Sequence, residues 1–159
     1  MKKALSLAAT ALLLCSSAQA ATDTVTINVS GALTRPPCTL TSARTLTADF
    51  GSIEYDKVAA ADAIDLPLAL TCPPNSSFTI AVTAASALTD TIASAGLANL
   101  GYQLTWKDNK TPINVRGAIR RMSNVQGAVD LGISAKLIAR GALTEGDFSA
   151  SAVVNIVYL

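Results

Sequence analysis

The last fourteen residues of the 159-residue chain read GDFSASAVVNIVYL (residues 146–159). After Gly146 the apolar side chains recur at every second position, on the face formed by Phe148, Ala150, Ala152, Val154, Ile156 and Tyr158. A period of two predicts a β-strand with one buried face. The chain stops at Leu159, so we expect no later segment to pair with the second edge of this strand, and a long apolar free edge promotes aggregation. An ordinary last strand of a complete sandwich remains the alternative.

The same period of two runs through most of the remaining chain, in segments rich in Val, Ile, Thr and Leu, which favour strands. We predict strands over residues 24–29, 38–40, 45–50, 63–71, 77–83, 101–107, 111–116, 129–138 and 147–158. Turn signals separate them, among them Pro36-Pro37 and Pro73-Pro74-Asn75. Residues 84–100 are rich in Ala, Ser and Thr and fit either a loop or a short helical turn. Many short strands at this spacing indicate an all-β, immunoglobulin-like sandwich.

A second alternating segment lies near the start of the chain, over residues 24–33. One face carries Val25, Ile27, Val29, Gly31 and Leu33, and the other carries polar and small side chains. The stiff Arg35-Pro36-Pro37 corner follows, so we expect this segment to form an arm ahead of the domain. One end of the chain then lacks a strand while the other has a spare one, and an arm that fills the gap of the next molecule builds a head-to-tail fibre. A first strand paired within its own domain is the alternative.

The first twenty residues have the layout of a secretory signal peptide. Lys2 and Lys3 precede an apolar run over residues 4–14, and Ala18-Gln19-Ala20 offers a cleavage site. We therefore predict three parts: a signal peptide (1–20), an N-terminal arm (21–37) and one domain (38–159). Cys15 leaves with the signal, and Cys38 and Cys72 remain in an oxidising compartment, so the simplest prediction is one disulfide. Closing the 33 intervening residues contributes about 3 to 4 kcal/mol in the chain-entropy model.

The composition excludes several classes of function. Without Lys2 and Lys3 the mature chain has 10 basic and 11 acidic residues, a balance that argues against a nucleic-acid partner. The chain contains no His, and the two remaining cysteines are assigned to a disulfide, so nucleophilic and acid–base catalysis lack their usual residues. Two thiolates without His also make a poor metal site. We predict no enzyme activity, no cofactor, no metal and no small-molecule substrate.

Several short motifs resemble those of the pilins of chaperone–usher fimbriae, and the likeness runs over residues 21–159. Gly146 is fourteenth from the C-terminus and Tyr158 is penultimate, with alternating apolar residues between them. The segment VTINVSGALTRPPCTL (residues 25–40) is similar to the donor arm and first cysteine of minor tip-fibrillum adaptor pilins. Asp49-Phe50-Gly51, Leu70-Thr71-Cys72-Pro73 and Leu100-Gly101-Tyr102-Gln103-Leu104 resemble further short motifs of the family.

The resemblance implies an incomplete immunoglobulin-like sandwich that lacks its last strand and polymerises by donor-strand exchange. Its partners would be a periplasmic chaperone, an outer-membrane usher and neighbouring fimbrial subunits that include an adhesin. The chain would pass through the periplasm to the cell-surface fimbrium. The donor strand would be Val25, Ile27, Val29, Gly31 and Leu33, and the strand that binds the chaperone would present Gly146, Phe148, Ala150, Ala152, Val154, Ile156 and Tyr158. Two alternatives stay open, a major rod subunit and a secreted binding module with a complete sandwich.

Overall fold

The computed structural model describes residues 23–34 and 36–159. The predicted signal peptide and Arg35 lie outside the described residues. The chain divides into two units, residues 1–33 and residues 34–159. The described part of the first unit, residues 23–33, contains neither helix nor strand.

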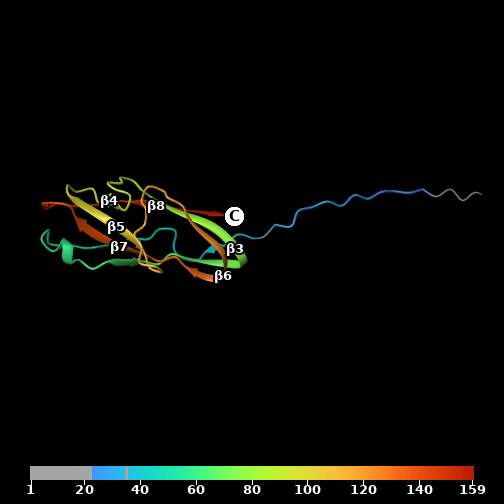
Figure 1. Cartoon of the computed structure of the whole chain (residues 1–159), viewed down its shortest axis with the longest axis horizontal. Helices are drawn as coiled ribbons and strands as arrows, with labels where there is room; N and C mark the ends of the chain where they lie inside the picture. Colours follow the sequence, from blue (N-terminus) through green and yellow to red (C-terminus); the bar gives the residue numbers. More distant parts are fainter. Residues whose placement is uncertain (1–22, 35) are drawn as a thin grey trace, which may run out of the picture. The chain divides into compact units, whose positions relative to one another are not determined.

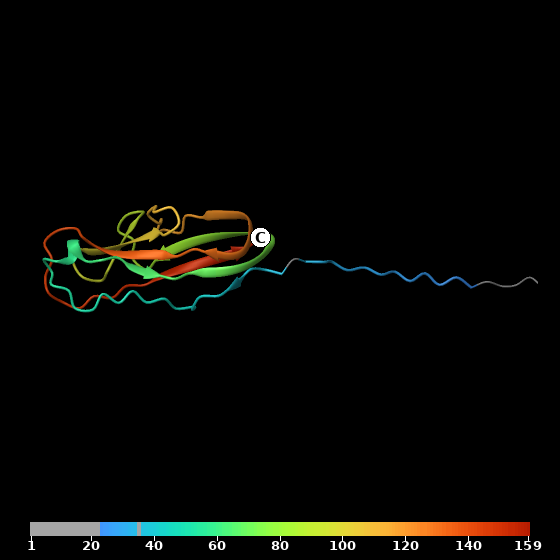
Figure 2. The same cartoon turned by 90° about the horizontal axis from the view of Figure 1, so that it is seen from below.

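The second unit is a sandwich of two four-stranded antiparallel sheets (Figures 1 and 2). One sheet contains β1 (Thr39–Leu40), β3 (Ala69–Ala84), β6 (Arg120–Asp130) and β8 (Ala152–Tyr158). The other has the order β2 (Ile64–Leu66), β7 (Ile133–Ala139), β5 (Leu100–Trp106) and β4 (Ile92–Ser94). Within the described residues the only helix is the short 3₁₀ turn η1 (Val58–Ala60). The predicted all-β sandwich is confirmed.

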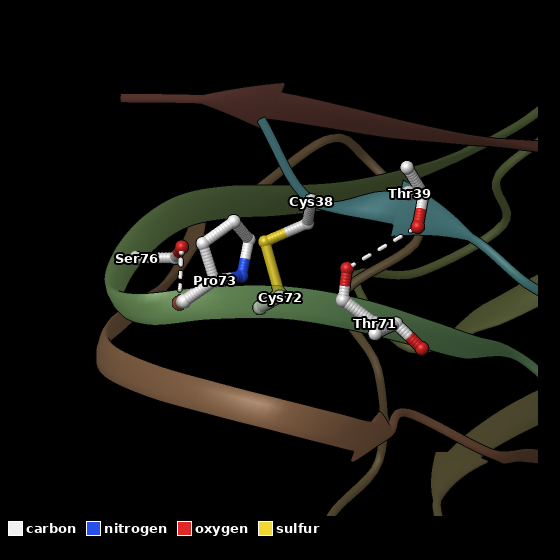
Figure 3. The surroundings of a disulfide bond; sticks show 6 residues. All are labelled: Cys38, Thr39, Thr71, Cys72, Pro73 and Ser76. Atoms are coloured by element: carbon white, nitrogen blue, oxygen red, sulfur yellow. Dashed lines mark hydrogen bonds between the residues drawn. A yellow bond between two sulfur atoms is a disulfide. The ribbon is translucent and has the colours of Figure 1, made fainter. Parts of the chain in front are cut away.

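Strand β3 is the common partner of the first sheet, because β1, β6 and β8 all pair with it. Asn75, just after Pro73-Pro74, has a φ of 58°, and the β3–β6 register shifts between Cys72 and Phe78, so the strand bends there (Figure 3). β6 follows β3 on both sides of the bend, whereas β1 pairs before the bend and β8 after it. The proline pair was predicted to be a turn between separate strands. It is instead a bend inside one strand.

Alternate side chains of β3 point inward and form much of the core between the sheets. Its inward side chains are all buried, at Leu70, Cys72, Phe78, Ile80, Val82 and Ala84. They meet Leu104 and Trp106 of β5 and Ile133 and Ala135 of β7 in one cluster. A smaller cluster of Val58, Ala95, Leu100 and Leu137 lies beside it.

Several predicted elements differ from the structure. Residues 63–71 divide into β2 and the start of β3 around Pro67, which cannot donate a ladder hydrogen bond. Residues 84–100 contain β4 rather than a helical turn, and 111–116 form only isolated bridges to Thr105 and Thr83. Strand β6 was missed over most of its length, because most of its side chains are polar or small and no period of two is visible. Residues 24–29 and 45–50 contain no strand.

Candidate functional site

The C-terminal strand β8 has one paired edge. It runs antiparallel to the second half of β3, from Ala152 opposite Ala84 to Tyr158 opposite Phe78. The N–H of Leu159 donates to the carbonyl of Ser77 (2.9 Å), and the N–H of Ala85 donates to the carbonyl of Ser151 (3.0 Å). Main-chain groups alternate between the two edges of a strand, so odd-numbered residues of β8 face β3 and even-numbered ones face away. No strand in the described part of the chain pairs with that second edge.

The inward side chains of β8 are half-buried at Ala152, Val154 and Ile156 and exposed at Tyr158. Ala152, Val154 and Ile156 pack against the main core cluster, and the Tyr158 ring lies edge-on to Phe78 with centroids 6.5 Å apart. Each nevertheless keeps contact with solvent, and Tyr158 is 38% exposed. The part of the core at this strand is therefore incompletely shielded from solvent.

The predicted C-terminal strand is longer than the observed one. Phe148 is half-buried against the smaller core cluster, whereas Ala150 is exposed. Both precede β8, which begins at Ala152. Gly146 has a φ of 154°, and a Cβ there would lie 3.0 Å from Leu97 Cδ1. A side chain at position 146 would therefore crowd Leu97, which glycine avoids.

A second segment without strand partners packs on the same core. Leu46, Ala48 and Phe50 are half-buried against the main cluster, and the residues between them are exposed. This alternation is that of a strand, yet residues 43–50 make no backbone–backbone hydrogen bond within the described chain. Figure 2 shows this segment and the C-terminal segment running along the sandwich. We use the term open face for the inward side chains of β8 together with Leu46, Ala48 and Phe50.

The predicted donor residues are fully available to solvent in this structure. The exposed fractions are 83% for Val25, 81% for Ile27, 92% for Val29 and 106% for Leu33. Apart from Gly31 and its two chain neighbours, no described residue has a heavy atom within 4 Å of the Cβ position of Gly31. Within the described residues of the arm, the large apolar side chains of this face are therefore exposed.

The predicted disulfide between Cys38 and Cys72 is confirmed, and both cysteines are buried (Figure 3). It joins the start of the domain to β3 beside the bend, where Thr39 Oγ1 also donates to the carbonyl of Thr71 (3.4 Å). The last residues of β8 lie at the same bend, because Tyr158 pairs with Phe78. Cys38 and the end of β8 are thus at one end of the sandwich.

Two ion pairs involve residues of the loop after β5. Arg120 pairs with Asp108, and its guanidinium lies 4.9 Å from the centre of the Trp106 ring. The hydrogen bonds from Arg120 hold the pKa of Asp108 below its usual value. Lys107 Nζ donates to Asp65 (2.7 Å), which lowers the pKa of Asp65 and raises that of Lys107. Arg120 therefore packs on a buried tryptophan. None of these charged groups belongs to the open face.

Two absences hold for the described residues. Across 23–34 and 36–159, no three His, Cys, Asp or Glu side chains are grouped to hold a metal ion. In the same residues, no helix has the length and apolar character needed to cross a membrane.

Comparisons with known proteins agree with this architecture. The chain is similar in fold to the P pilus rod subunit PapA, at 20% identity and a TM-score of 0.65, over 78% of this chain and all of that one. It is also similar to a subunit in the structure of a chaperone–usher pilus, at 16% identity and a TM-score of 0.64, over 90% of this chain and all of that one. No curated protein sequence matches the chain. The family model described as "Fimbrial protein" matches residues 27–158, well over half of the chain. The chain therefore belongs to the fimbrial protein family and is a structural subunit, not an enzyme.

Proposed function

We propose that this subunit joins its neighbours by donor-strand exchange, in which the arm of one subunit enters the open face of the next. The observation that carries this proposal is the unpaired edge of β8 above a half-buried apolar face. The same chain carries an exposed segment with an alternating apolar face, residues 25–33, that belongs to neither sheet of the described structure. An added strand would satisfy the free main-chain groups and cover the core.

The apolar face of the arm is large enough to hold such a joint. Burying a large aliphatic side chain is worth about 1.5 to 3 kcal/mol, so Val25, Ile27, Val29 and Leu33 together supply roughly 6 to 12 kcal/mol before ordering costs. Gly31 lets the backbone of the arm approach its neighbour closely. Val25 to Leu33 spans nine residues, or about 30 Å of extended chain, and Ala150 to Tyr158 also spans nine.

The positions of Cys38 and of the end of β8 favour an incoming arm that runs antiparallel to β8. The base of a subunit's own arm, Cys38, and the end of β8 lie at the same bend of β3. An incoming arm parallel to β8 would bring the donor domain to this crowded end. An antiparallel arm leaves the donor domain at the opposite end, so each joint extends a line of subunits. In the register of full overlap, Val25 lies opposite Tyr158 and Leu33 opposite Ala150.

The open face would need a temporary cover before assembly, because unpaired strand edges above an apolar surface aggregate. We propose that a periplasmic chaperone lends a strand to β8, and that an outer-membrane usher exchanges it for the arm of the next subunit. The mature chain expressed alone would then aggregate, whereas co-expression with its chaperone would yield a soluble 1:1 complex in size-exclusion chromatography. A stable chaperone-free monomer with a cooperative melt would favour a complete-sandwich binding module instead.

Within the fibre we propose a minor adaptor position between an adhesin and the other subunits. The support is the likeness of residues 25–40 to the arms of tip-fibrillum adaptors. A major rod subunit is the second candidate, because the two similar structures are a rod subunit and a pilus with a rod. Quantitative mass spectrometry of purified fibres separates them. An adaptor should be a minor component of the fibre, whereas a rod subunit should be the main one.

A further inference from the structure

A cavity of about 270 Å³ opens beside Phe148, where the chain approaches β8. Most of its walls are apolar, and they include Ile53, Val58, Leu97, Leu100, Leu143 and Phe148. Two carboxylate side chains, Glu54 and Glu145, also line it. Both are exposed, and neither forms an ion pair with any other described residue. The cavity is therefore an apolar hollow with two carboxylates at its rim that form no ion pair with the described residues.

The incoming arm brings a positive charge to this position. In the antiparallel register of full overlap, Leu33 of the donor lies opposite Ala150, and the second residue after it falls opposite Phe148. That residue is Arg35, the only lysine or arginine between residues 21 and 43. A guanidinium on a long aliphatic stem suits this site, because the stem can lie on apolar walls while the charge reaches the carboxylates.

We propose that the rim formed by Glu54 and Glu145 recognises the base of the incoming donor arm by charge. Its preferred partner is an arm with a cation two residues beyond its last large apolar side chain, as in this chain. The inference rests on the proposed strand exchange and adds a criterion for choosing between arms whose apolar faces are alike. Complementary charge at an exposed rim speeds association and rejects like-charged partners more than it strengthens the finished joint.

The test measures how fast arm peptides bind to the open face. The probes are labelled peptides of residues 21–37, either unchanged or with Arg35→Glu, added to the mature chain as it refolds with its disulfide formed. At 20 mM NaCl, we expect the Arg35→Glu peptide to associate about 5- to 10-fold more slowly than the unchanged one, and at 500 mM NaCl we expect less than about 2-fold. The variant Glu145→Lys should remove or reverse this preference.

Asp62→Lys is the matched control, because it makes the same change of charge at an exposed acidic residue that does not line the cavity. It should leave the ratio of the two rates unchanged. Equal rates for both peptides on the unaltered subunit at low salt would overturn the inference, as would an equal effect of Glu145→Lys and Asp62→Lys. Failure of the unchanged peptide to bind at either salt concentration would overturn the proposed strand exchange itself, and the inference with it.

Discussion

Replacing Ile27 by Asp tests the donor role of the arm without disturbing the domain that carries it. Ile27 is 81% exposed, so the charged side chain should leave folding and capture by the chaperone intact. In the joint the same position would lie on the apolar core. Losing the buried isoleucine costs about 1.5 to 3 kcal/mol, and placing an unpaired carboxylate there costs several more.

These terms amount to about half of the 6 to 12 kcal/mol assigned to the four large side chains of the arm. A loss of about 4 kcal/mol weakens binding roughly 1,000-fold, since each 1.4 kcal/mol is a factor of ten. The assay mixes the purified chaperone complex with excess peptide of residues 21–37 and follows chaperone release. The Ile27→Asp peptide should leave the complex intact over the time in which the unchanged peptide dissociates it.

Thr26→Asp is the matched control, because it places the same charge one residue away, on the opposite face of the arm. The Thr26→Asp peptide should release the chaperone at nearly the rate of the unchanged peptide. Exchange by Ile27→Asp at the wild-type rate would refute the assignment of this face to the donor strand. Loss of chaperone capture when Ile27→Asp is made in the full chain would also refute it, because the arm would then belong to the folded domain.

Three further predictions concern the domain. Val154→Asp should abolish chaperone capture in a pull-down, because Val154 is half-buried on the strand that the chaperone is proposed to pair with; capture at the wild-type level would contradict this. Cys38→Ser should lower the free energy of unfolding by about 2 to 5 kcal/mol in denaturant titration, and an unchanged midpoint would count against it. The pKa of Asp108 is lowered below 3.8, so the stability it contributes is fully present above that pH and is lost as the pH falls through its folded-state pKa. Asp108→Asn should remove this part of the loss of stability at low pH. Identical pH profiles of the free energy of unfolding for the variant and the unaltered protein would contradict the prediction.

The C-terminal strand and the disulfide could be predicted from sequence because their signals are local. Alternation of apolar residues gave the strand that contains Val154 and Ile156, and counting cysteines gave the Cys38–Cys72 bond. The segment at Leu46, Ala48 and Phe50 shows the predicted alternation of burial but no strand hydrogen bonds. Periodicity reports which side chains face a core, whereas a strand also needs a neighbouring backbone.

The parts that could not be predicted depend on contacts between distant residues. β6 has few apolar side chains, and its place in the sheet comes from its ladder with β3, which runs from Ala69 opposite Asp130 to Ile80 opposite Arg120. The bend at Asn75 joins what were predicted as separate strands, because β6 continues along both sides of it. The acidic cavity beside Phe148 combines residues from several loops, and no local pattern marks them as neighbours.

Hydrogen–deuterium exchange along β8 tests the central claim most directly, because the two edges of this strand can be read residue by residue. The amides of Val153, Asn155 and Val157 face β3 and should be protected in the freshly refolded chain before it aggregates. The amides of Val154, Ile156 and Tyr158 face the unpaired edge. We predict that these three exchange rapidly in the freshly refolded chain and become protected, by about 100-fold or more, when the arm peptide is added. Equal protection of both sets before any strand is added would show that the edge is already paired, and would contradict the account.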